Sequence, residues 1–397
     1  MTVRVNKSAL NLREKLSELE RPIGLKGNEL MRAETAQDAR DFISAGRKNM
    51  VINGAMTVSQ RNLTSSYTIP NATGGSYGGP DRWAINEDSG GSVSVNQDSD
   101  PRSGNADGSE VQEFYQAMQI ACASYSGLSG TQNVHFFQNI EGYNITRLKW
   151  GTEKAIPVTL SFWVRCNYPG IYCVGIENNA TDRCNIREYT INPGFKWQKV
   201  ELTFPGCPDG VWDNLTNTGI RLRFCLGTGD TYNDGVDGQW ISNDELATSN
   251  QTNFMDSNNN RFFITGVQLE EGSNATDFDH RSYGEELALC QRYYYEYPKG
   301  NTYNIIANGF ANSTTNAIFH FQFPVPMRTT PSTSGISGSW HVIDGTSHNV
   351  SSFSAITDAT QLTGRVDATT SGLTVGRGCM LRNNNDATAT FGFSAEL

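Results

Sequence analysis

The chain has 397 residues, with 31 Lys and Arg against 41 Asp and Glu, a net charge of 31 − 41 = −10, and only 18% of its residues are charged. No apolar run reaches the ~20 residues of a membrane-spanning helix, and an acidic chain without a Lys/Arg cluster is a poor partner for nucleic acid. The first residues lack the apolar core of a signal peptide, so we expect no membrane insertion and assembly in a cytoplasm.

Residues 1–48 differ in charge from the rest, with ten Lys and Arg against seven Asp and Glu, a net of +3 that leaves −13 for the remainder. Apolar residues at spacings of 4, 3, 4 and 3 predict a helix of two heptads, at Val5, Ala9, Leu12, Leu16 and Leu19.

A second short helix is predicted at Thr35–Gly46, with Phe42 and Ile43 on its apolar face. Helices this short cannot bury their stripes alone. We therefore expect both stripes to form an oligomer interface between copies of residues 1–48 around a symmetry axis. Packing on the body of the same subunit is the alternative.

From Asn49 onward the apolar period changes to two. Val158–Val164, Val200–Phe204 and Ile220–Leu226 each alternate apolar with mainly polar residues, as strands covered on one side do. With turn clusters between such runs, residues 49–298 are predicted to form an antiparallel, jelly-roll-like β-sandwich. The polar stretches Pro70–Ser109 and Gly227–Asn260 are predicted to be long loops.

A helix at Tyr283–Tyr295 is predicted to end the sandwich. After it, residues 299–397 contain a run with Phe319, Phe321 and Phe323 on one face of a strand, and they are predicted to form a smaller C-terminal β domain. The fold class is therefore mainly β, with a helical, coiled-coil assembly region at the N-terminus. The very low charge of the last hundred residues favours partial burial in an oligomer.

The eight Cys residues form no CxxC pair and no Cys/His pair with zinc spacing. We expect reduced structural thiols, with a disulfide or a metal site left open as lesser alternatives.

Catalytic motifs are absent from the sequence, which contains neither G-x-S-x-G nor H-E-x-x-H. His280 lies among acids in DFDHRSYGEE, where a hydrolytic dyad is a minor alternative to a structural turn. We therefore expect no enzymatic activity and no cofactor.

Sugar binding is better supported, because pyranose C–H faces pack on aromatic rings and hydroxyls need planar polar partners. Trp163 and Arg165 share the polar face of one predicted strand, and Arg221 and Arg223 share that of another. If the two strands are neighbours, they form a platform; an interface or a contact between sheets is the alternative. The glycan-binding candidates are Trp163, Arg165, Trp212, Arg221, Arg223 and Trp240.

The acidic loop GDTYNDGVDG offers hard oxygen ligands at close spacing, at Asp230, Asn233, Asp234 and Asp237. Such ligands suit Ca²⁺, but the Glu that ends an EF-hand loop is missing. These residues are a weak calcium candidate, with a solvated turn as the alternative.

Several ordered blocks resemble the fibre and appendage proteins of tailed bacteriophages of the marine, cyanophage type. They include GLKGNELMRAETAQDARDFISAG, NMVINGAMTVSQR, TLSFWVR, WQKVELTFPG, FFITGVQLEEGSNATDFDHRSYGEELALCQRYYY and PVPMRTTP, within residues 25–331. The central blocks are also similar to carbohydrate-binding-module jelly rolls.

This resemblance implies a homotrimeric virion protein, a tail fibre assembled in the host bacterial cytoplasm. Residues 1–48 would mediate trimerisation and bind other tail proteins, and the β domains would bind a host surface glycan. A polysaccharide depolymerase of a phage tailspike and a structural adaptor or decoration protein are the alternatives. The acidic loop and the chain after about Pro331 match no part of the family pattern.

Overall fold

The computed structural model describes residues 49–61, 65–98, 111, 113–125, 127–297 and 299–397. The predicted trimer interface, Val5, Ala9, Leu12, Leu16, Leu19, Phe42 and Ile43, lies outside these residues. Its coiled coil remains a prediction.

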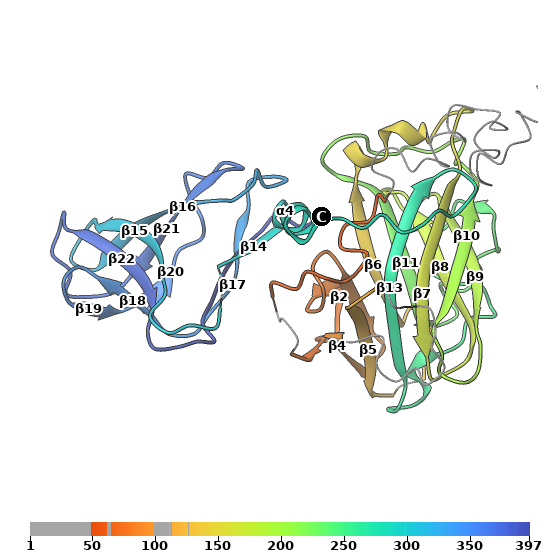
Figure 1. Ribbon diagram of the computed structural model, residues 1–397, viewed down its shortest axis with the longest axis horizontal. Coiled ribbons are helices and arrows are strands. Elements are labelled where there is room, and N and C mark those ends of the chain that lie inside the picture. Colours follow the sequence, from red (N-terminus) through yellow and green to blue (C-terminus); the bar gives the residue numbers. More distant parts are fainter. Residues whose placement is uncertain (1–48, 62–64, 99–110, 112, 126, 298) are drawn as a thin grey trace, which may run out of the picture. The chain divides into compact units, whose positions relative to one another are not determined.

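Two antiparallel sheets pack face to face to form the sandwich (Figure 1). In spatial order, sheet A consists of β1 (Tyr67–Thr68), β4 (Ser92–Asp98), β5 (Ala117–Ser124), β13 (Arg261–Glu271), β7 (Val158–Cys166) and β10 (Gln198–Phe204). Sheet B consists of β12 (Trp240–Ile241), β9 (Cys184–Ile191), β8 (Gly170–Glu177), β11 (Thr218–Thr228), β6 (Asn133–Glu141), β3 (Ala84–Asp88) and β2 (Ala72–Tyr77).

The strand pairings have the nested order of a jelly roll. Of the eight strands β5 to β11 and β13, the first pairs with the last, β5 with β13, and the second with the seventh, β6 with β11. The third pairs with the sixth, β7 with β10, and the fourth with the fifth, β8 with β9. An eight-stranded double sheet with this nested pairing is a jelly roll. The strand pairings therefore confirm the predicted sandwich.

The apolar alternation of the sequence builds the core between the two sheets. The predicted inward residues Leu160 and Phe162 of β7 and Leu222 and Phe224 of β11 are all fully buried. The Phe224 ring stacks on Phe136 at a centroid distance of 4.7 Å and meets Phe162 edge-on at 5.2 Å. Aromatic contacts of this kind stabilise a core beyond the area that they bury.

Three short 3-10 helices, η1 (Gly142–Asn144), η2 (Thr146–Leu148) and η3 (Phe254–Asp256), lie in connections of the sandwich. The α-helix of the described residues is α4 (Tyr283–Gln291), and the Ser282 side chain caps it by accepting from the amide of Glu285. The helix is shorter than predicted because β14 (Tyr294–Glu296) pairs with β23 near the C-terminus.

The C-terminal region has two further antiparallel sheets and its own core. Sheet C consists of β14, β23 (Thr390–Ser394) and β17 (Ser332–Ser337). Sheet D consists of β19 (Ser347–Asn349), β18 (Trp340–Ile343), β22 (Gly378–Asn383), β15 (Ile305–Ala311), β16 (Asn316–Gln322), β21 (Thr363–Thr369) and β20 (Ser352–Phe353). The predicted inward residues Phe319, Phe321 and Phe323 are buried in this second core.

A buried ion cluster joins the end of the chain to the sandwich. Glu396 binds Arg82 through one carboxylate oxygen and Arg61 through the other, the second at 3.0 Å. Arg61 also lies 3.9 Å from Asp81. Nearby, Arg292, which follows α4, forms a bidentate pair with Glu141 of β6 at 2.6 and 2.9 Å. We call Arg61, Asp81, Arg82 and Glu396 the Glu396 cluster.

One of the two loop predictions, that for Pro70–Ser109, is wrong. The stretch Pro70–Ser109 contains β2, β3 and β4, whereas Gly227–Asn260 contains only β12, η3 and the end of β11 as regular elements. In β4, Val93 and Val95 are buried between polar neighbours. Two inward apolar residues are enough for a strand when the other face is polar, but they are a weak signal in a polar sequence.

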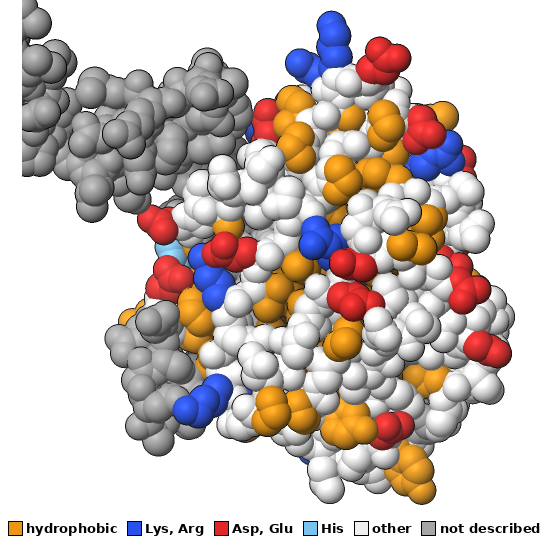
Figure 2. Space-filling view, turned by 90° about the vertical axis from the view of Figure 1, so that its right-hand side faces the viewer, with side chains coloured by type: hydrophobic (Ala, Val, Ile, Leu, Met, Phe, Trp, Pro, Cys, Tyr) orange, Lys and Arg blue, Asp and Glu red, His pale blue; other side chains and the backbone are white. Residues whose placement is uncertain are grey.

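The side of the protein drawn in Figure 2 is mainly uncharged and polar, with scattered acidic, basic and hydrophobic side chains. This matches a composition in which few residues are charged. Among the described residues, no helix is both long and apolar enough to span a membrane.

Candidate functional site

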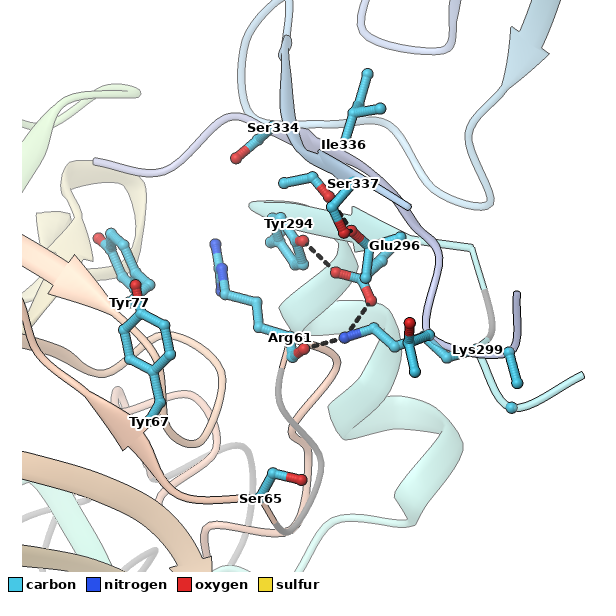
Figure 3. A pocket seen from close by; sticks show the side chains of 15 residues that line it. Arg61, Ser65, Tyr67, Tyr77, Tyr294, Glu296, Lys299, Ser334, Ile336 and Ser337 are labelled. Atoms are coloured by element: carbon cyan, nitrogen blue, oxygen red, sulfur yellow. Dashed lines mark hydrogen bonds and ion pairs between the residues drawn. The ribbon is translucent and has the colours of Figure 1, made fainter. Parts of the chain in front are cut away.

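A crevice of about 700 Å³ lies between the first strands of the sandwich and sheet C (Figure 3). Tyr67 and Tyr77 stand on one side, and Tyr294, Glu296 and Lys299 on the other. We call it the tyrosine crevice. A concave site with aromatic walls and a few convergent polar groups is typical of small-ligand binding.

The sandwich side of the crevice presents two rings at the ends of short strands. Tyr67 belongs to β1 and is 37% exposed, and Tyr77 is the last residue of β2 and is half-buried. Tyr67 lies against Gly78, where an added Cβ would come within 2.0 Å of the ring. The missing side chain at Gly78 therefore allows the Tyr67 ring to lie close to the backbone at this position.

The opposite side is a chain of hydrogen bonds that begins in β14. The buried Tyr294 hydroxyl donates to the Glu296 carboxylate at 2.5 Å. Glu296 also forms an ion pair with Lys299 at 2.7 Å. Lys299 also donates to the backbone oxygen of Arg61. Burial raises the pKa of both Tyr294 and Glu296. Each of the three side chains therefore has a partner within this wall of the crevice.

The charges at the crevice are compensated by the protein itself. The Arg61 guanidinium lies 3.5 Å from the ring centre of Tyr294 and 4.8 Å from that of Tyr77, and its charge is met by Glu396. Lys299 is likewise met by Glu296. A charged ligand would find no unpaired opposite charge on these groups, so the crevice suits a neutral, polar ligand.

Hydroxyl groups from β17 and β23 border the crevice. Ser337 and Thr390 share a hydrogen bond of 2.8 Å, and Thr390 also binds the backbone oxygen of Gly335. A register shift in β17 between Ser334 and Ser337 bends this strand where it meets the crevice. Hydroxyls that both donate and accept can bind the hydroxyls of a sugar.

The predicted platform of Trp163, Arg165, Arg221 and Arg223 does not form. Trp163 and Arg165 lie on β7 of sheet A, and Arg221 and Arg223 lie on β11 of sheet B. Because the polar faces of the two sheets point in opposite directions, the structure separates the two pairs.

Arg221 and Arg223 are held by acidic partners of the same subunit. Glu177 of β8 is fully buried and accepts from Arg221 and Arg223, each at 3.0 Å. Arg223 also binds Asp244 at 2.8 Å. Burial is the largest of the causes that raise the pKa of Glu177 to about 7, and the nearby Asp244 also raises it. The two arginines lower the pKa, but each by less than burial raises it. These arginines order sheet B and the loop that covers it.

The Glu177 and Asp244 carboxylates both bind the Arg223 guanidinium, each through one oxygen.

Trp163 is half-buried, and Arg165 is 6% exposed beside three other aromatic rings. Trp212 is only 5% exposed, and Trp240 is half-buried. The rings of Trp212 and Trp240 meet at 5.6 Å, and each packs edge-on against Trp150. This cluster fixes the loops at one end of the sandwich to its core.

Two of the calcium candidates, Asp230 and Asp237, bind separate partners through their carboxylates. Asp230 accepts from the amide of Gly130 at 2.7 Å, and Asp237 accepts from Arg187 at 3.1 Å. The amide of Asp234 donates to Glu245 at 3.1 Å, and Asn233 lies beside it in the same loop. In the part of the chain that the structure describes, no three His, Cys, Asp or Glu side chains group as a metal site would.

His280 lies at the surface beside Glu113. Its Nε2 lies 3.4 Å from Glu113, and its ring packs against Phe114 and Phe278. The neighbouring Arg281 instead binds Glu286 at 3.2 Å and the backbone oxygens of Asn49 and Val51. This segment organises a turn, as the structural alternative predicted.

The sequence analysis missed the tyrosine crevice. Its walls come from residues more than 200 positions apart. Tyr77 lies in the stretch taken for a loop, and Tyr67 comes just before that stretch. The one sequence feature that indicated the crevice was the density of tyrosines in QRYYYEYPKG, at residues 291–300. The sequence analysis interpreted the start of this segment as the end of a helix.

No protein-family model matches the chain, and no curated protein matches it either. Similar solved structures include the enzymatically active domain of bacteriophage CBA120 tailspike protein 4, with 12% identity and a TM-score of 0.28 over 56% of this chain and 21% of that one. A putative sugar binding protein from Bacteroides thetaiotaomicron has 12% identity and a TM-score of 0.31, over 56% and 100% of the two chains.

A family 11 carbohydrate-binding module from Clostridium thermocellum has 11% identity and a TM-score of 0.26, over 54% and 99% of the two chains. The structural neighbours are thus carbohydrate-binding modules and a phage tailspike domain, and the match spans about a fifth of that tailspike chain. At these TM-scores the likeness carries no argument about function. The jelly roll rests on the strand pairings of the chain itself.

Proposed function

We propose that this chain binds a host surface glycan in the tyrosine crevice, as the subunit of a tailed-phage fibre that attaches the virion to a bacterium. The single observation that carries glycan binding is the chemistry of the crevice. Tyr67 and Tyr77 offer rings for sugar C–H faces, Ser337 and Thr390 offer hydroxyls, and the charged groups are already paired.

The fibre role is supported by the ordered resemblance of the sequence to phage appendage proteins. In a homotrimer assembled through residues 1–48, three weak glycan sites would act together, and linked sites gain avidity without any new contact. The N-terminal region would bind other tail proteins. The chain would act in the virion without catalysis.

Glycan binding is tested by replacing the exposed ring. We expect Tyr67→Ala to weaken binding of a neutral host oligosaccharide by about tenfold or more, equivalent to about 1.4 kcal/mol. Isothermal titration of the full chain measures this. Tyr283→Ala is the matched control, since Tyr283 is 62% exposed on α4 and lies outside the crevice.

Equal binding by the wild type and Tyr67→Ala would contradict the crevice as the site. The two alternatives give other results. A tailspike depolymerase would release reducing sugar from host capsular polysaccharide. A structural adaptor would bind no glycan but would bind a purified tail or capsid protein tightly.

A further inference from the structure

Arg165 differs from the other deeply buried arginines of the described structure. Arg61, Arg82, Arg223 and Arg281 each form an ion pair with a carboxylate. Within the described residues, Arg165 forms neither an ion pair nor a hydrogen bond, although it is only 6% exposed. Burying a cation without a partner is costly, and proteins avoid it.

Three aromatic rings enclose the Arg165 guanidinium. Its central carbon lies 4.4 Å from the ring centre of Phe263, 4.6 Å from that of Phe195 and 5.1 Å from that of Trp197. Phe263 is the cross-strand partner of Arg165 on β13, and Phe195 and Trp197 come from the connection between β9 and β10. Cation–π contacts offset part of the cost of burial.

Phe195 is held above the cation in an uncommon backbone conformation. Its φ is +54°, in the left-handed region that bulky residues seldom adopt. The preceding Gly194 has φ +108° and gives the loop this path. Phe195 is nevertheless 39% exposed, so one part of its ring contacts the arginine and another part faces solvent.

The rings satisfy the faces of the guanidinium but not its edge. A guanidinium has five N–H donors in its own plane, and aromatic rings accept none of them as an oxygen does. Its Nε is buried without a hydrogen-bond partner. Among the described residues, Asp98 attracts Arg165 electrostatically, and no hydrogen bond joins the two side chains. The N–H donors of Arg165 are therefore open to an acceptor that does not belong to the described residues.

We propose that Arg165 binds the carboxylate of an acidic sugar residue, a uronic acid, in a second glycan site on the outer face of sheet A. A carboxylate matches the planar donor pair of a guanidinium, and the exposed parts of Phe195 and Trp163 can pack against the pyranose. An acidic peptide offers the same carboxylate but has no pyranose face to pack on the aromatic rings. The inference rests on the proposed glycan attachment and adds a ligand class to it.

The test compares trigalacturonate with its fully methyl-esterified form, which has the same sugars without charge. We expect the full-length protein to bind the acid at least about tenfold more tightly than the ester, as a charge-assisted contact gives. Added NaCl should reduce this preference. Equal affinity for acid and ester would overturn the inference, as would equally tight, Arg165-dependent binding of triglutamate.

The Arg165→Met variant removes the charge and keeps a side chain that packs between rings. We expect it to bind acid and ester equally and to unfold at the wild-type temperature or above, because an unpaired buried cation is lost. A preference for the acid that survives in a folded Arg165→Met protein would overturn the proposal. Should this variant not fold, the salt dependence of the wild-type preference decides.

Tyr67→Ala distinguishes the two glycan sites. If the proposed crevice is wrong, Tyr67→Ala will bind neutral glycan like the wild type while the preference for the acid persists. If the Arg165 site is wrong, the preference will be absent while Tyr67→Ala still weakens binding of neutral glycan.

Discussion

Single residues show how environment sets chemistry in this protein. Glu177 and Glu296 are both buried glutamates with cationic partners, yet the pKa of each is raised because desolvation exceeds the attraction of those partners. The sequence indicates that both are acidic but not that both are buried. Residue type is read from the sequence, whereas its electrostatic state depends on neighbours that only the fold supplies.

The raised pKa of Glu177 has a testable effect on stability. The unfolded glutamate titrates near its ordinary pKa of 4.5 and the folded one near 7, so between these values the folded state binds more protons. The contribution of Glu177 to the free energy of unfolding therefore falls as the pH rises from 4.5 to 7.

Glu177→Gln removes this titration. In urea unfolding at several pH values, we expect wild type to lose stability relative to Glu177→Gln across that window. The raised pKa of Glu177 would be contradicted if the difference in free energy of unfolding between wild type and Glu177→Gln stayed constant with pH. A difference that shifted in favour of the wild type as the pH rises would contradict it as well.

At the scale of elements, the sequence predicted the strands with strong apolar alternation and missed the polar ones. The inward faces of β7, β10, β11 and β16 are as predicted because apolar residues recur at every second position. In β4, two valines are the only inward apolar residues, so the hydrophobic pattern is too sparse to separate strand from loop. Strand order was not predictable, because alternation shows which face is buried and not which strand lies beside it.

This is also why the predicted platform failed and the crevice was missed. Trp163 and Arg221 each lie on the polar face of a strand, as expected, but the jelly-roll order places β7 and β11 in opposite sheets. The crevice needs β14 to lie near the early strands of the sandwich. That placement follows from the pairing of β14 with β23 and from the Glu396 cluster.

The pairing of β15 with β16 depends on Gly309. An added Cβ at this position would come within 1.8 Å of the backbone oxygen of Ile318 on the neighbouring strand. We expect Gly309→Ala to destabilise the protein by about 1–3 kcal/mol, the cost of overpacking, measured by denaturant unfolding. Gly378→Ala on β22 is the matched control, since nothing lies within 4 Å of its added Cβ. Equal stability of the two variants would contradict this account of the close strand approach.

At the scale of the whole molecule, the Glu396 cluster couples the end of the chain to the sandwich. Arg61 and Arg82 both depend on Glu396, whose side chain is 8% exposed. We expect Glu396→Gln to lower the free energy of unfolding by about 3–5 kcal/mol, because breaking a buried pair leaves cations uncompensated.

The control for this prediction is Asp358→Asn. Asp358 pairs with Arg365, but its side chain is 70% exposed, and exposed pairs contribute little. Chemical unfolding should distinguish the two variants, with Asp358→Asn close to wild type. A Glu396→Gln protein as stable as wild type would show that the cluster does not hold the C-terminal region to the sandwich.

The assembly state remains a prediction from residues 1–48. Three copies of 43.7 kDa give about 131 kDa, which light scattering after size exclusion can measure. We expect this trimer mass for the full chain and a smaller mass when Leu12 and Leu16 are both replaced by Asp, since the apolar stripe would then carry charge. A stable monomer at micromolar concentration would contradict both the trimer and the avidity argument.

All eight cysteines are free and buried, and burial raises the pKa of each thiol. A thiolate is the reactive form, so an alkylating dye should modify the native protein very slowly and the unfolded protein at once. The rate of labelling would then report how often each sheet opens, with Cys379 reporting on sheet D of the C-terminal region and Cys166 on sheet A of the jelly roll. One new cysteine placed on the surface would be the sole fast-reacting position, so the protein could carry a fluorophore on host cells without removal of any native thiol.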